Sequence, residues 1–233
     1  MIDHVRDLAS VREATDRLIE AVSSWDNAEL AKPSRLPGWT RGHVLAHLSR
    51  NADALVNVLR GMPMYKDAET READIERDAP RPLDAQLTDL RATADRFQAL
   101  GEEPADWSRT VELRNGVTDS AARVPFRRWV EVALHHVDLG AGYELEDLPE
   151  EFVSREIDFL ADRWSGRPDV PPVTLRLGHD EDAASWRTGG TEGEPVVLAG
   201  TAAELLGWLS GRGDKGAHLA VLAGPAVPDL PAL

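Results

Sequence analysis

The chain has 233 residues, of which 42% are hydrophobic and 29% charged, and its formal net charge at pH 7 is -15. This balance is typical of a globular protein that forms its own core. The negative charge argues against partners with phosphate backbones and against anionic membranes, because the field over most of the surface repels them. The chain has no cysteine. That excludes disulfides, thiolate zinc sites and a protein thiol nucleophile, so any thiol chemistry needs sulfur from a bound small molecule.

The N-terminal residues are polar and lead into an amphipathic pattern, which is unlike a signal peptide. No window of the sequence reaches the apolar length of a membrane span. We therefore expect a cytoplasmic protein with no membrane partner and no nucleic-acid partner. The sequence leaves open whether it is a monomer or a homodimer.

Apolar residues at helical spacing predict a series of helices in the first two thirds of the chain. The first covers residues 3–23. Thr40 is a suitable N-cap for the second, which Gly61 ends, and the third covers 83–101. Residues 64–82 are highly charged and fit a loop or a short helix, and residues 102–122 look irregular. A fourth helix begins near Pro125 and ends at Gly140. Four such helices predict a bundle.

The composition changes after this bundle. A fifth helix is expected over 151–164, and Pro and Gly residues then break any helix. Alternating apolar residues predict strands at 173–177, 184–187, 195–198 and 220–222, with a helix capped by Thr201 between the last two. The predicted fold class is therefore α+β, with a helix bundle over residues 1–148 and a small α+β domain over residues 149–233.

Four histidines fall in two of the predicted helices, and three of them have partners at a spacing that suits a metal. Glu131 and His135 are four residues apart, as are His43 and His47, so each pair lies on one helix face. His136 is the fourth. Helix bundles build metal sites from inward-facing groups of this kind.

Two histidines and a carboxylate would give three protein ligands, the number in a catalytic zinc site whose fourth position is open to water or substrate. Iron, nickel or cobalt would fit the same ligands. The alternative is that these are solvated pairs or buried histidines with satisfied hydrogen bonds.

Arginines are the second feature, because an acidic protein needs local positive charge to hold an anionic substrate. Arg71 lies in the charged stretch, and Arg212 lies at the end of the helix that Thr201 caps. Either could hold a carboxylate through two parallel hydrogen bonds. Alternatively, both are surface arginines.

Three segments resemble the mycothiol-dependent maleylpyruvate isomerases, within the wider DinB-like superfamily of metal-binding four-helix bundles. They are residues 36–47 (LPGWTRGHVLAH), Asn51–Ala52, and residues 131–140 (EVALHHVDLG). The resemblance extends over nearly the whole chain and includes Met64–Tyr65 and residues 210–213 (SGRG).

The resemblance implies zinc bound by His47, Glu131 and His135, with no metal role for His43 or His136. It implies catalytic roles for Arg71 and Arg212, with Arg212 also contacting the cofactor, mycothiol. The match at Arg71 rests on its distance from Met64–Tyr65. Asp138 could orient a ligand imidazole, or it could simply belong to the helix end.

The implied reaction, part of gentisate degradation, is the cis–trans isomerisation of maleylpyruvate, a small anionic substrate, to fumarylpyruvate. A thiolate stabilised at zinc adds to the double bond, the bond rotates, and the thiol is eliminated. Alternatives are a mycothiol S-transferase acting on other electrophiles, a zinc hydrolase that needs no thiol, and a regulatory binder without activity.

Overall fold

The computed structural model describes residues 3–180 and 182–231. The chain forms two compact units, one up to Tyr143 and one from Glu144 onward. Among the described residues, no helix has both the length and the apolar character needed to cross a membrane.

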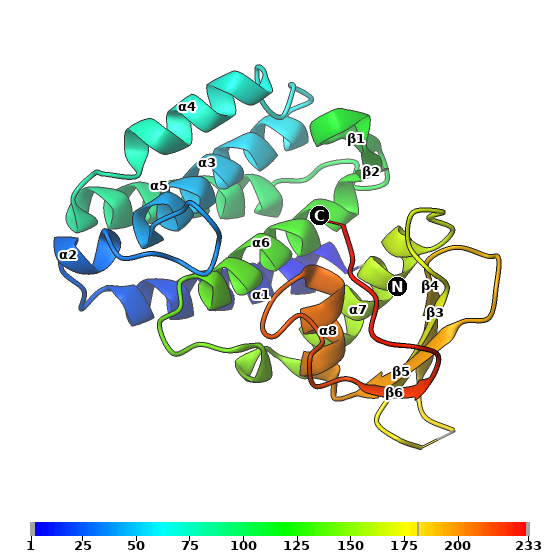
Figure 1. Ribbon diagram of the computed structural model, residues 1–233. Helices are drawn as coiled ribbons and strands as arrows, with labels where there is room; N and C mark the ends of the chain where they lie inside the picture. The colour runs from blue at the N-terminus through cyan, green and yellow to red at the C-terminus, as the bar shows by residue number, and fades with distance from the viewer. Residues whose placement is uncertain (1–2, 181, 232–233) are drawn as a thin grey trace. The chain divides into compact units, whose positions relative to one another are not determined.

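Four long helices of the first unit form the predicted bundle. Helix α3 packs against α5 and α6, and α1 packs against the other sides of α5 and α6, so the four enclose one core (Figure 1). Val44, Leu45, Leu48 and Leu55 on the apolar face of α3 are all buried in it. Each such side chain stabilises the fold by roughly 1.5–3 kcal/mol. The bundle helices are α1 (His4–Val22), α3 (Arg41–Leu59), α5 (Leu83–Glu102) and α6 (Val124–Asp138).

The ends of α3 and α6 follow the sequence signals. Thr40 is the N-cap of α3, and its side chain accepts a hydrogen bond from the backbone N–H of His43. Gly140 follows α6 with φ 62°, a left-handed conformation that suits glycine. Near its start, α3 needs Gly42, because a Cβ there would lie 2.3 Å from the carbonyl oxygen of Ala79.

Shorter elements surround the bundle. The charged stretch after α3 contains the short helix α4 (Ala68–Asp78), which packs on α3. Helix α2 (Asn27–Leu30) precedes α3. The prediction that residues 102–122 are irregular was wrong. They contain an antiparallel hairpin of β1 (Thr110–Glu112) and β2 (Thr118–Ser120), joined by η1 (Arg114–Gly116) and followed by η2 (Ala121–Arg123). Strands of three residues are too short to show an alternating pattern.

The second unit is the predicted small α+β domain. Its four-stranded sheet has the order β4-β3-β5-β6; β3 and β5 are parallel, and the two outer pairs are antiparallel. Helix α7 packs against α8 and β4, and the indole N–H of Trp164 donates to the carbonyl of Leu209 at 3.1 Å. The elements are η3 (Leu145–Asp147), α7 (Glu150–Trp164), β3 (Val173–Leu177), β4 (Ser185–Thr188), β5 (Val196–Gly200), α8 (Ala202–Ser210) and β6 (Ala220–Ala223).

Candidate metal centre

Helices α3 and α6 bring three side chains with metal-binding atoms together in the bundle. Nε2 of His47 lies 2.9 Å from Oε2 of Glu131, and Nε2 of His135 lies 3.3 Å from the same oxygen. One potential ligand atom from each residue lies within 4.8 Å of the others. The three residues therefore converge, as the helical spacing predicted for Glu131 and His135, and two imidazoles with one carboxylate form a donor set that suits zinc.

The cluster is enclosed on the histidine side and accessible at the carboxylate. The side chain of His47 is 6% exposed and that of His135 12%, whereas that of Glu131 is 33% exposed. A small molecule could thus approach the three ligand atoms from the Glu131 side.

Hydrogen bonds to the shared Glu131 oxygen influence the protonation of both histidines. Burial lowers the pKa of His47 to about 4, with the hydrogen bond to Glu131 opposing this. Burial alone would raise the pKa of Glu131, but hydrogen bonds with His135 and His47 hold it well below its ordinary value. The cluster therefore holds an ionised carboxylate and a neutral His47 at neutral pH, which are the forms that bind a metal.

Asp138 supports His135 from behind. Its Oδ2 lies 2.8 Å from Nδ1 of His135, and its side chain is only 2% exposed. Burial lowers the pKa of His135, but the bonds to Asp138 and Glu131 outweigh it, so the pKa is raised overall. The contact leaves Nε2 of His135 facing the cluster and gives Asp138 the orienting geometry that the sequence left undecided.

Arg71 is the sequence-predicted arginine that the structure places at this cluster. Its Nη2 lies 3.2 Å from Nδ1 of His47, and its guanidinium lies over the ring of Tyr65, 5.8 Å from the centroid. It also pairs with Glu72. Arg71 thus comes from α4 to cover the His47 side of the cluster.

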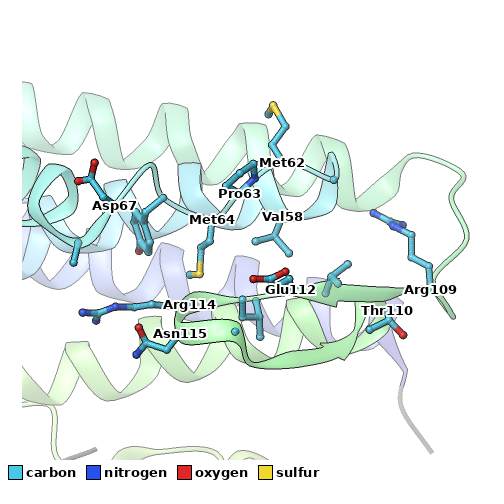
Figure 2. Close-up of a pocket in the computed structure, with 16 residues that line it drawn as sticks. Val58, Met62, Pro63, Met64, Asp67, Arg109, Thr110, Glu112, Arg114 and Asn115 are labelled. Carbon is cyan, nitrogen blue, oxygen red and sulfur yellow. The ribbon is translucent and has the colours of Figure 1, made fainter.

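Tyr65 connects the cluster to a pocket of about 640 Å³, which it helps to line. The pocket lies between the segment after α3 and the β1–β2 hairpin. Figure 2 shows Met64 pointing toward the hairpin, with Arg114 and Asn115 at the hairpin end and Arg109 at the opposite end. The pKa of Tyr65 is raised by burial first and by the charge of Glu131 second. Tyr65 therefore lies next to the cluster through Arg71, which contacts both the Tyr65 ring and His47.

The other two histidines of these helices have different partners. His43 completes the N-terminal capping box of α3, with Nδ1 lying 2.7 Å from the hydroxyl of Thr40. The ring of His136 stacks on Tyr143 at a centroid distance of 4.0 Å. Neither belongs to the cluster, in agreement with the expectation from the resemblance.

Arg41 ties the two sequence motifs together. Its Nε donates to the carbonyl of Leu139 at 2.9 Å, and its Nη2 donates to that of Gly140 at 2.8 Å. These bonds satisfy backbone acceptors at the C-terminal end of α6. The start of α3 is thereby attached to the end of α6, which fixes the register that brings His47 to Glu131. This role was not predicted from the sequence, although Arg41 is part of the first motif.

Arg212 lies in the second unit, directly after the left-handed Gly211 that ends α8. Its Nη1 donates to the carbonyl of Ser210 at 3.2 Å. Its predicted roles toward substrate and cofactor stay predictions.

Comparisons with known proteins agree with this architecture. Residues 11–140 match the family model of the mycothiol maleylpyruvate isomerase N-terminal domain, and residues 147–231 match that of the MDMPI C-terminal domain. A crystal structure of the mycothiol-dependent maleylpyruvate isomerase superposes with a TM-score of 0.85 at 26% identity, covering 99% of this chain and 97% of that one. A histidine-to-alanine mutant of the enzyme of that name gives 0.86 at 27% identity, with the same coverage.

A sequence search of curated proteins finds no match. The two family models nevertheless cover most of the chain, one in each compact unit. The chain therefore belongs to the mycothiol-dependent maleylpyruvate isomerase family of enzymes.

Proposed function

We propose that this chain is a zinc- and mycothiol-dependent isomerase that converts maleylpyruvate to fumarylpyruvate. The observation that carries the proposal is the convergence of His47, Glu131 and His135, with their ligand atoms within 4.8 Å of one another. Family membership supports the reaction, and the absence of cysteine means that the thiol must come from outside the chain.

The donor set fits zinc, because three protein ligands leave one position open. When bound, zinc would accept the thiol sulfur in that position and favour the thiolate at neutral pH. Reversible addition of the thiolate to the cis double bond would allow rotation and then elimination of the thiol. The partial exposure of Glu131 provides the side from which thiol and substrate would approach.

Arg71 would hold a substrate carboxylate and stabilise the negative charge formed on addition. A neutral imidazole that gives Nε2 to a metal keeps its proton on Nδ1. With a metal on Nε2, Nδ1 of His47 would no longer accept a hydrogen bond from Arg71, whose Nη2 lies 3.2 Å away in the metal-free cluster. Metal loading would thus leave Nη2 of Arg71 available to an anion, while Nη1 stays paired with Glu72. Arg212 is proposed as the second carboxylate ligand and as a contact to the thiol.

The test is the loss of maleylpyruvate absorbance with zinc-loaded protein, with and without mycothiol. Turnover only with mycothiol, which is recovered unchanged, supports the isomerase. Consumption of the thiol would identify an S-transferase, and turnover without any thiol would identify a hydrolase. Arg71→Ala should keep the zinc and lose at least about a hundredfold in kcat/KM, as expected for removal of a charged group that stabilises developing charge. Arg77→Ala on the outer part of α4 is the matched control, because Arg77 pairs with Asp74 and Asp78 away from the cluster.

A further inference from the structure

A second polar pair joins α3 and α6 one helical turn from the metal cluster. Asn51 lies four residues after His47, and Arg128 lies three residues before Glu131, so both pairs connect the same two antiparallel helices. Nη1 of Arg128 donates to Oδ1 of Asn51 at 2.8 Å. Asn51 belongs to a segment that resembles the family, and the proposed mechanism gives it no role.

Arg128 is a buried cation that, among the described residues, forms no direct ion pair. Its exposure is 0%, and Nη2 has no hydrogen-bond partner in the part of the chain that is described. Within the same residues, no carboxylate forms an ion pair with it, and its one hydrogen bond goes to a neutral amide. Burial lowers the pKa of Arg128 to about 10, so the guanidinium remains charged at neutral pH.

Such an arrangement is costly if packing is its only purpose. Buried charges normally have a charged partner, and apolar residues of similar volume fill a core at no electrostatic cost. At neutral pH the charges that favour the Arg128 cation are those of Glu131 first and Asp53 second; the phenol of Tyr65 is uncharged there, because its pKa is raised. Glu131 is already shared between two histidines, which leaves the positive field of Arg128 available to the centre.

We infer that Arg128, held by Asn51, is a positioning residue: a fixed buried positive charge that favours an anion at the His47–Glu131–His135 centre and disfavours a bare cation there. The inference rests on the proposed function, because the anion it serves is the thiolate or the enolate of that reaction. Because Arg128 is completely buried, it would act on a bound anion through its field and not by contact.

The size of the effect follows from the helical geometry. One turn separates the pairs by about 5 Å along the axis, and a unit charge about 7 Å away acts through an effective dielectric constant of about 20. This changes the affinity for a unit anion by roughly tenfold to fiftyfold. The affinity for a divalent cation changes in the opposite direction by at least as much.

Asn51→Asp tests the inference without altering the packing. The new carboxylate is nearly isosteric with the amide and neutralises Arg128 in place. Zinc affinity, measured by chelator competition, should rise at least tenfold. Binding of mycothiol to the cobalt-substituted protein, followed by thiolate-to-cobalt charge-transfer absorption, should weaken at least tenfold, and the melting temperature should not fall. Asn57→Asp adds the same charge to α3 ten residues beyond His47 and should change neither affinity.

A purely structural role predicts that both affinities stay unchanged in Asn51→Asp or weaken together. Either result in a folded variant overturns the inference. Should Asn51→Asp not fold, Arg128→Met, which also removes the net charge, must give the same opposed changes, while Arg128→Lys must keep both affinities near wild type. If the wild-type protein binds zinc but no thiol, the proposed function fails, and the zinc affinities alone decide the role of Arg128.

Discussion

The Asp138→Asn substitution tests whether Asp138 orients His135, because it leaves all three proposed metal ligands in place. Oδ2 of Asp138 lies 2.8 Å from Nδ1 of His135, and water cannot replace it, because the Asp138 side chain is 2% exposed. A buried hydrogen bond to a charged group contributes about 1.5–3 kcal/mol. The amide in Asp138→Asn keeps an acceptor oxygen but lacks the charge, so part of this energy is lost. Mutation of such a partner behind a metal-binding histidine typically costs tenfold to a hundredfold in metal affinity, which is about 1.4–2.8 kcal/mol. We therefore expect zinc to bind tenfold to a hundredfold more weakly to Asp138→Asn near pH 8.

The raised pKa of His135 also predicts how the difference in zinc affinity between wild type and Asp138→Asn changes with pH. His135 must be neutral to bind zinc, and its pKa in the metal-free protein is raised. Protons therefore compete with zinc in the wild type as the pH falls through that raised pKa. In Asp138→Asn the pKa returns toward its ordinary value, so this competition begins at a lower pH. The difference in affinity between wild type and variant should be largest near pH 8 and smaller near pH 6.

Chelator competition from pH 6 to 8 measures both features. Asp119→Asn is the control, since Asp119 is a partly buried carboxylate that pairs with Arg127 outside the cluster. It can alter stability but should leave zinc affinity unchanged. Wild-type zinc affinity in Asp138→Asn across this range would refute the assignment of Asp138 as the group that orients His135.

Three further predictions concern the same centre. Glu131→Ala and His135→Ala should each lose the metal and keep most of the helical circular dichroism, because the bundle core does not depend on these groups; stoichiometric metal in either would contradict the ligand assignment. Arg212→Ala should retain one metal per chain and lose most turnover, and unchanged turnover would remove Arg212 from the mechanism. The pKa of His47 is depressed to about 4 in the fold. The neutral imidazole therefore contributes about 3 kcal/mol to the stability of the metal-free protein above the unfolded pKa of about 6.5, and this contribution is lost as the pH falls toward 4. Denaturant titrations should show this loss of stability in the wild type and a smaller loss in His47→Asn.

The bundle and the position of the cluster were accessible from the sequence because both depend on helical periodicity. Thr40, Gly140 and the apolar face of α3 are local signals, and the structure confirms each one. Periodicity also places Glu131 and His135 on one face. It could not decide between His43 and His47, because spacing does not reveal that the ring of His43 turns back to the hydroxyl of Thr40.

The features that were missed depend on contacts between helices. Arg41 was noted in the sequence only as part of the first motif, yet it binds the end of α6 across nearly a hundred positions of sequence. In the sequence Arg128 is one of several polar residues of an amphipathic helix, and nothing in the pattern indicates that it is completely buried. Long polar side chains change role with the neighbour that tertiary packing supplies, so a pattern within one helix cannot identify them.

The same contacts explain why two distant sequence motifs belong together. The first motif supplies Arg41, His47 and, one turn later, Asn51; the second region supplies Arg128, Glu131 and the carbonyls at the end of α6. Because α3 and α6 are antiparallel, the three contacts occur in reverse order along α6, and one alignment of the helices satisfies all of them. A residue inserted between Arg128 and Glu131 would rotate one partner by about 100° and separate the buried cation from the metal ligands. Both motifs are thus constrained by one geometric requirement. The contact of Arg41 with the end of α6, the metal ligands and the buried charge of Arg128 must stay in register.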